Sequence, residues 1–250
     1  MQYAGVVEDS TWRQNLQDAY SRRLVTMNDI QITDHCLGEG VSGKVFLATL
    51  RPKRDRQSRR WPIHPPSIYK NGSEKRKRAA SIQVALKIVA RAAGGSDAER
   101  DSKDAVVRCA LLEARLHARL DHPNLVRLLA VQEERQPVML ALELCEHGAL
   151  LDLLRARAGI ANDFDGAQRR DMATQVAAGL RYLHSKLCIH RDVAARNVLV
   201  ASSAQGSTTP VCGYVLKLSD LGLARQLRTE ADYYRVGWVI MTVAHDVSLP

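Results

Sequence analysis

In its first half, the chain places short apolar runs between polar or glycine-rich stretches, the pattern of β-strands joined by turns. Alternating apolar residues surround a glycine cluster in residues 30–50, which predicts a strand, a tight loop and a second strand. Residues 105–120 have helical spacing, with Ser102 or Asp104 available as the N-cap. Three further strands are predicted at residues 82–89, 125–131 and 138–144, the last two joined as a hairpin.

The second half of the chain changes to helical spacing. Residues 150–157 and 167–187 are predicted helices. Short strands are predicted at residues 198–200 and 215–218, on either side of a Ser-, Gly- and Thr-rich connection. Four apolar residues share one face of the second helix: Met172, Val176, Leu180 and Leu183. Strands followed by helices predict an α+β fold.

Composition places the chain among soluble globular proteins. Its 250 residues, 46% hydrophobic and 25% charged, suffice for one large domain or two lobes. The longest apolar runs are far shorter than the roughly 20 residues of a membrane-spanning helix, and the first residues lack the pattern of a secretory signal. The five cysteines are odd in number and widely separated, which indicates free thiols. We therefore expect a cytoplasmic location, with no membrane span in this chain.

The net charge of +9 comes from one segment, residues 51–80, which contains eleven Lys or Arg against Asp55 and Glu74. A long solvated loop is the favoured interpretation over a functional basic patch, because charge runs are usually solvated. Nucleic acid is therefore an unlikely partner, although binding that weakens with salt would indicate it. Residues 1–29 are interpreted as a polar leader.

The first chemical motif is GEGVSGKVF, in which Gly38, Gly40 and Gly43 have the spacing G-x-G-x-x-G. Glycines at this spacing let the backbone approach phosphates closely, but a dinucleotide-binding turn or a simple hairpin could use the same residues. The following KVFLATL continues as a strand, not as the helix that a dinucleotide fold requires. A strand after the glycines favours a phosphate lid.

The second motif is VALK, which ends at Lys87 on the next predicted strand. A lysine within an apolar strand is costly unless its ammonium is paired, and Glu113 on the following helix is the natural partner. The alternative is that Lys87 extends to solvent from an edge strand while Glu113 lies on a solvated helix face.

Two later motifs are HRDVAARNVLV at residues 190–200 and SDLGLAR at residues 219–225. With the glycine motif and VALK, they stand in the order of the protein-kinase signature, and the chain resembles the protein kinase family over residues 30–237. The resemblance implies a bilobal α+β fold with a β-rich N-lobe containing one helix and a helical C-lobe. It places the N-lobe and hinge at residues 30–146 and part of the C-lobe at residues 147–237.

The resemblance also assigns roles. Asp192 would be the catalytic base, with Arg196 carrying positive charge near the transferred phosphate. Asn197 and Asp220 would hold Mg²⁺. Lys87 would hold the ATP phosphates, with Glu113 fixing it. From the residues alone, Asp192 could instead be an ordinary surface carboxylate, and Asn197 and Asp220 could be capping or turn residues.

By resemblance, Leu142 is the gatekeeper before the hinge, and ATP is the cofactor together with Mg²⁺. His190 would position the catalytic loop. The residues expected to contact ATP are Leu37, Gly38, Gly40, Gly43, Val45, Ala85, Lys87, Glu143, Cys145 and Leu199. Apolar members of this set would belong to the core in any fold.

The catalytic loop resembles that of tyrosine kinases, because Ala194 replaces the lysine usual in serine/threonine kinases and the cation follows at Arg196. The pair Tyr233 and Tyr234 resembles the activation-loop tyrosines of receptor-type kinases. The expected function is thus ATP-dependent phosphoryl transfer to tyrosine of proteins, in a chain that could be the intracellular part of a receptor.

The sequence departs from the family pattern in several places. Leu221 replaces the aromatic residue of D-F-G, Ser42 replaces the aromatic residue at the glycine-loop tip, and His117 stands where an aliphatic residue is usual, which predicts a looser active alignment. After residue 237 the kinase pattern gives way to an atypical tail, residues 238–250, so we expect a truncated domain. The alternative function is a non-catalytic Mg-ATP-binding or interaction fragment.

Overall fold

The structure, a computed structural model, describes residues 20–21, 23–40, 43–51, 81–89, 97–158, 164–203 and 210–227. Of residues 97–104 it describes the backbone alone. Several predictions lie outside the described residues: those for most of the leader, nearly all of the basic loop, the tail 238–250, Ser42, Tyr233 and Tyr234.

Five strands form one antiparallel sheet in the order β1-β2-β3-β5-β4. Their bounds are β1 (Ile30–Gly40), β2 (Gly43–Leu50), β3 (Ile82–Val89), β4 (Leu128–Gln132) and β5 (Val138–Glu143). The two strands predicted within residues 30–50 and the predicted hairpin of β4 and β5 are confirmed, while the tight loop between β1 and β2 lies outside the described residues. The run predicted as a strand at residues 125–131 becomes a strand only from Leu128.

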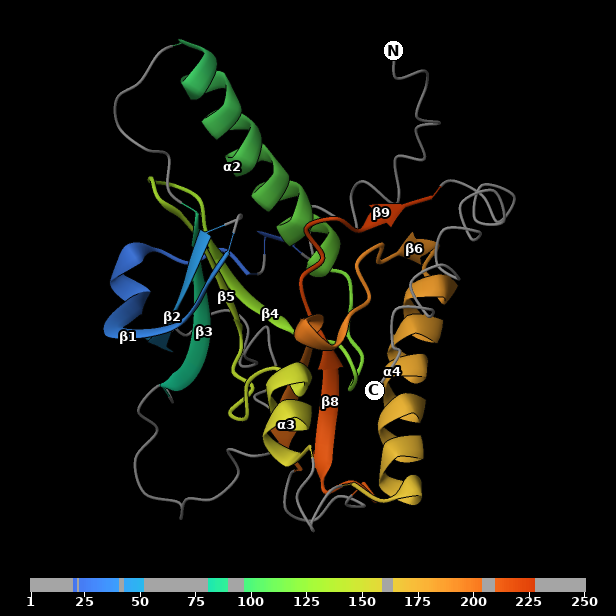
Figure 1. The fold of residues 1–250 in the computed structure, drawn as a ribbon. Helices are drawn as coiled ribbons and strands as arrows, with labels where there is room; N and C mark the ends of the chain where they lie inside the picture. Colours follow the sequence, from blue (N-terminus) through green and yellow to red (C-terminus); the bar gives the residue numbers. More distant parts are fainter. Residues whose placement is uncertain are drawn as a thin grey trace, which may run out of the picture.

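Helix α2 (Asp97–His117) lies beside the sheet, at the top of the molecule in Figure 1. Its apolar stripe includes Val107, Ala110 and Ala114, which pack against β4 and β5. Because the helix begins at Asp97, the prediction that Ser102 or Asp104 caps it is wrong. The first helical turns contain mostly Asp, Glu, Arg, Lys and Ala, so they carry no apolar period that would mark the start.

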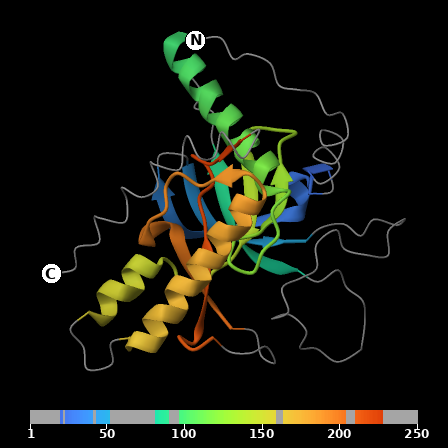
Figure 2. The same cartoon turned by 90° about the vertical axis from the view of Figure 1, so that its right-hand side faces the viewer.

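The second half of the chain forms helices α3 (Leu150–Arg157) and α4 (Gly166–Ser185), which lie at the bottom of the view in Figure 2. Asp165 caps α4 by accepting a hydrogen bond from the Gln168 amide at 2.7 Å, and the Gln168 side chain returns a contact to the Asp165 amide. Both helices agree with their predicted positions to within two residues.

Both predicted strands are present as β7 (Val198–Ser202) and β8 (Tyr214–Leu218), and they pair antiparallel. Their apolar side chains and one face of α4 form a common core that includes Met172, Leu183 and Leu216. Strands β6 (Cys188–Ile189) and β9 (Arg225–Gln226) form a second, two-residue pair that the sequence pattern did not predict. The 3-10 helix η3 (Ala195–Asn197) precedes β7.

Within the described part of the chain, no helix combines the length and the apolar composition needed to cross a membrane.

Candidate active site

Of the three glycines of the first motif, Gly38 and Gly40 lie in the last three residues of β1, and Gly43 is the first residue of β2. Because β2 follows them as a strand, the dinucleotide-binding alternative is excluded. Gly43 has a φ of +133°, and a Cβ there would lie 2.3 Å from the Ile88 carbonyl oxygen, so only glycine fits. A Cβ at Gly38 or Gly40 would meet nothing within 4 Å, so space is open beside the turn.

Lys87 lies on β3, which is flanked by β2 and β5, and its ammonium lies 3.1 and 2.9 Å from the two Glu113 carboxylate oxygens. The two side chains are only 9% and 6% exposed. The alternative of an edge-strand lysine reaching solvent is therefore wrong. Burial raises the pKa of the Glu113 carboxyl, and the Lys87 ammonium opposes that rise. This pair joins the sheet to α2.

The catalytic-loop motif holds its carboxylate with two neighbours. Asp192 Oδ1 lies 2.6 Å from Arg196 Nη2, and Asp192 Oδ2 accepts a hydrogen bond from Asn197 Nδ2 at 2.8 Å. His190 is buried, and its Nε2 lies 2.9 Å from the Ser219 carbonyl oxygen, which joins this loop to the segment before Asp220. These contacts fit the predicted positioning role of His190.

Asp220 brings a second carboxylate to the buried pair, because its Oδ1 lies 4.0 Å from Lys87 Nζ. Its backbone has a φ of 57°, and its side chain accepts a hydrogen bond from the Gly222 amide. Leu221, which replaces the expected aromatic residue, is buried in the same core as Leu120. The substitution therefore keeps the apolar anchor next to Asp220.

The residues expected around adenine come from four strands and the hinge. In the sheet register, Ala85 lies opposite Leu142, and Val45 lies opposite Lys87. Cys145 belongs to a small apolar cluster against which Leu142 and Leu199 pack. Burial raises the pKa of the Cys145 thiol to about 12, so it remains a thiol near neutral pH. Leu37 is half-exposed on β1.

Comparison with family models decides what these motifs represent. The model described as protein tyrosine and serine/threonine kinase matches residues 31–242. The chain belongs to the protein kinase family. The structure is accordingly a bilobal kinase fold of mixed α and β structure, with the five-stranded sheet and α2 in the N-lobe and α3 and α4 in the C-lobe.

Three relatives can be compared individually, and two of them are named as tyrosine-protein kinases. The chain is 32% identical to the fibroblast growth factor receptor of Hydra vulgaris. The matched region covers 81% of this chain and 21% of the Hydra protein. It is 33% identical to tyrosine-protein kinase sid-3 of Caenorhabditis elegans over 67% of its length, or 12% of sid-3. A match to mouse tyrosine-protein kinase Fer is 41% identical over 46% of the chain and 12% of Fer. The chain thus spans about a fifth or less of these relatives.

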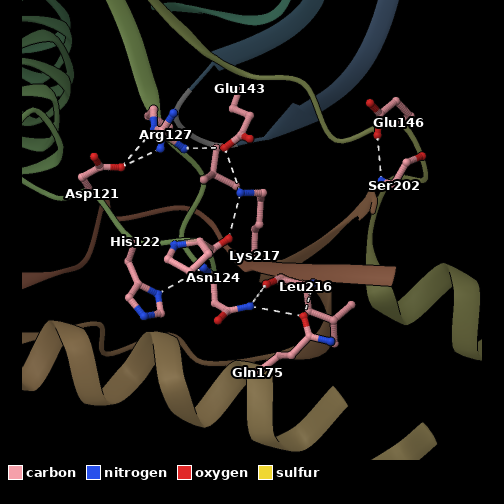
Figure 3. Close-up of polar contacts among 12 residues, drawn as sticks. Asp121, His122, Asn124, Arg127, Glu143, Glu146, Gln175, Ser202, Leu216 and Lys217 are labelled. Atoms are coloured by element: carbon pink, nitrogen blue, oxygen red, sulfur yellow. Dashed lines mark hydrogen bonds and ion pairs between the residues drawn. The ribbon is translucent and has the colours of Figure 1, made fainter. Parts of the chain in front are cut away.

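Behind the hinge of the kinase, a second buried Lys–Glu pair connects the two lobes (Figure 3). Lys217 of β8 lies 3.1 Å from Glu143 Oε2 at the end of β5, and the two side chains are 11% and 10% exposed. The Glu143 carboxylate also accepts from the Arg127 amide, and Lys217 donates to the Pro123 carbonyl oxygen. The sequence predicted a role for the Glu143 backbone but missed Lys217, because a lone Lys in VLKL has the pattern of an exposed strand position.

An amide network continues this contact into the C-lobe, as Figure 3 shows. Asn124 Nδ2 donates to the Leu216 carbonyl oxygen at 2.9 Å and to Gln175 Oε1 at 3.2 Å. Gln175 Oε1 also accepts from the Leu216 amide. The polar residues between α2 and β4 therefore hold β8 and α4 together.

His117, four residues after Glu113, is buried, and its Nε2 makes a short contact with the Val126 carbonyl oxygen. The Val126 amide in turn donates to the Leu218 carbonyl oxygen at 2.9 Å. The ring is hydrogen-bonded and the Lys87–Glu113 pair is closed, while the predicted looser alignment at His117 stays a prediction.

Proposed function

We propose that the protein transfers the terminal phosphoryl group of ATP to tyrosine hydroxyls of proteins. The observation that carries the proposal is the closed Lys87–Glu113 pair with Asp220 beside it. A lysine placed in this way can neutralise phosphate charge, and Asp220 can hold the cation that accompanies ATP.

The ATP site would lie between the glycine turn and the hinge. Backbone groups of residues 38–43 would cover the phosphates, and Lys87 would contact them. Adenine would lie between the apolar side chains of the two lobes, and its edge would meet the Glu143 carbonyl and the Cys145 amide. The strand register that aligns Ala85 with Leu142 supports this arrangement.

Asn197 and Asp220 would hold Mg²⁺, which supplies charge neutralisation of the phosphates when bound. Among the described residues, no group of three or more His, Cys, Asp or Glu side chains could form a complete metal cage. That fits Mg²⁺, which usually takes one or two protein carboxylates and completes its shell with phosphate oxygens and water. The Asn197 contact with Asp192 would keep the metal ligand next to the base.

Asp192 would accept the proton of the attacking hydroxyl. Its contacts with Arg196 and Asn197 fix its orientation, which a general base requires. The tyrosine preference is supported by Ala194 and Arg196 in the catalytic loop and by two relatives named as tyrosine-protein kinases. All five cysteines, which lie among the described residues, are free, and this supports a reducing compartment such as the cytoplasm.

The test is radiolabelled phosphoryl transfer from ATP to a glutamate–tyrosine copolymer, with the longest natural chain that contains these residues. Asp192→Asn should lower the rate by about 10²- to 10⁴-fold while MgADP affinity stays within about twofold, because the base acts in the transition state. Asp152→Asn, an exposed carboxylate on α3, is the matched control and should leave the rate unchanged.

Phosphate on serine or threonine of a mixed protein substrate such as casein, with none on the copolymer, would overturn the tyrosine assignment. MgATP binding without any transfer would support the non-catalytic alternative. Transfer that survives Asp192→Asn would show that another group accepts the proton.

A further inference from the structure

The segment before β1 adds to the edge of the N-lobe sheet. The Val25 amide donates to the Val131 carbonyl oxygen at 2.9 Å, and the Val131 amide donates to the Arg23 carbonyl oxygen at 2.8 Å. Leu24 forms a parallel bridge with Val131 of β4. The Arg23 side chain also donates to the Leu128 carbonyl oxygen at 3.0 Å. We call residues 20–21 and 23–29 the strap, because they cover the free edge of β4.

Tyr20 is the innermost residue of the strap, with 1% of its surface exposed. Its ring belongs to the apolar cluster formed by Val107, Ala110 and Ala114 of α2 and by apolar residues of β4 and β5. Its hydroxyl donates to Glu133 Oε2 at 2.6 Å, just after β4. The ring thus occupies a place between α2 and the sheet.

The contacts of Tyr20 lie next to the active-site glutamate on the same helix. Ala114 directly follows Glu113, and Ala110 is one helical turn before Ala114. The Arg115 guanidinium lies 5.7 Å from the centroid of the Tyr20 ring. Small alanine side chains leave room for an aromatic ring, and the ring then sets the separation of helix and sheet.

We propose that Tyr20 is a positioning residue, which holds α2 at the distance from the sheet where Glu113 pairs with Lys87. The role rests on the proposed ATP site, because the pair matters only if Lys87 contacts phosphate. Without the ring, α2 would move toward or away from β4, and Glu113 would lose its fixed place. The strap would then act on the nucleotide site without touching nucleotide.

The first arm of the test needs no nucleotide and uses the 250-residue chain. In Tyr20→Ala, amide hydrogen exchange at residues 105–117 should accelerate by about tenfold or more, since local opening of the helix becomes easier, while α4 amides stay unchanged. Tyr20→Phe removes only the contact with Glu133 and should give a smaller change. Tyr214→Ala removes another packed tyrosine, in the C-lobe core, and should leave residues 105–117 unchanged.

The second arm is a double-mutant cycle on MgADP affinity with Tyr20→Ala and Glu113→Gln. A positioning role predicts that the double variant loses no more affinity than the weaker-binding single variant, because both changes break the same contact. A merely stabilising role predicts that the two losses add.

Unchanged exchange in α2 of Tyr20→Ala, equal acceleration in all elements, or additive losses of affinity would overturn the proposal. If Tyr20→Ala fails to fold, the same comparison of amide hydrogen exchange in α2 and α4 is made with Tyr20→Leu. If the unaltered chain binds no MgADP, the ATP proposal fails, and the exchange arm still decides whether Tyr20 positions α2.

Discussion

The two buried Lys–Glu pairs of this kinase have similar geometry and different surroundings. In the active site, Lys87 lies 2.9 Å from Glu113, and behind the hinge, Lys217 lies 3.1 Å from Glu143. The hinge pair has further protein partners, since Glu143 accepts from a backbone amide and Lys217 donates to a carbonyl oxygen. The active-site pair has instead a second carboxylate, Asp220, at 4.0 Å.

This difference separates a pair whose remaining partners come from the protein from a pair that we propose to complete its contacts with a ligand. Burying two charges is favourable only when their remaining hydrogen-bonding capacity is used. The protein itself provides those partners at the hinge. At Lys87, the ammonium lies near the Glu113 and Asp220 carboxylates. Phosphate oxygens could bind the ammonium and a cation could bind the carboxylate oxygens, so the two together could provide the remaining partners.

The largest expected effect comes from removing one lysine of either pair. Lys217→Met and Lys87→Met should each lower the free energy of unfolding by about 3–5 kcal/mol, because each leaves a buried carboxylate without its cation. The two variants should differ in function, since only Lys87→Met removes a predicted phosphate contact. Urea unfolding and MgADP titration of the 250-residue chain measure both quantities.

The control for this prediction replaces both members of the hinge pair. Lys217→Met combined with Glu143→Leu should recover most of the lost stability, because no buried charge remains. If Lys217→Met alone costs less than about 1 kcal/mol, the hinge pair is not the buried structural contact described above.

The second prediction concerns His117, which follows Glu113 on α2 and contacts the Val126 carbonyl next to Arg127. Burial lowers the pKa of His117 to about 4, so the folded protein favours the neutral ring. In the unfolded chain the pKa returns to about 6.5, and the unfolded state binds more protons between these values. The stabilisation is therefore complete above about pH 6.5 and is lost as pH falls toward 4, by up to about 3 kcal/mol.

Unfolding free energies measured from pH 4.5 to 8 check this dependence. His117→Gln keeps a donor for the Val126 carbonyl but has no titrating ring, so its profile should be flatter than that of the unaltered chain. Burial also lowers the pKa of His190, which leaves a residual slope of the same sign. Identical profiles for the two proteins would exclude His117 as the source.

Most of the fold could be predicted because its elements carry their own periodicity. Strand β3 and helix α3 have the predicted bounds, since β3 is one continuous run rich in β-branched residues and the Leu-rich run of α3 starts just after Gly148. The start of α2 was missed because a charged helical turn has no apolar period. The pair β6 and β9 was missed because two residues are too few for a pattern, and tertiary packing determines them.

The active site was easier to predict than its supports. Motif spacing along the chain pointed to Lys87, Glu113 and Asp192 as site candidates, and the structure brings Lys87 and Glu113 into contact. Tyr20 and Lys217 carry no motif, and their neighbours in sequence are polar or alternate as in an exposed strand. Burial of these two residues depends on elements distant in the chain, which a single sequence does not show.

A third, smaller effect is expected at Asn124, next to the Lys217 contact. Asn124→Ala removes the donor to the Leu216 carbonyl oxygen and to Gln175 Oε1. Loss of a buried donor leaves acceptors unsatisfied, and we expect a cost of about 1–3 kcal/mol in unfolding free energy. Thr174→Ala, an exposed position on α4, is the matched control, with an expected change within about 0.5 kcal/mol. A similar change in both variants would contradict a special role for Asn124.

The smallest effect is expected at a third Lys–Glu contact, between Lys44 and Glu39 beside the glycine turn. The two charged atoms lie 3.2 Å apart, nearly as in the buried pairs, but the side chains are 55% and 62% exposed. Water and salt screen such a pair, and fixing two long side chains costs conformational entropy. Glu39→Gln should therefore change the unfolding free energy by no more than about 0.5 kcal/mol, measured by urea unfolding beside Lys217→Met. Because distance is nearly constant across the three pairs, the series tests whether burial sets the energetic cost. A loss at Glu39 as large as that in Lys217→Met would show that it does not.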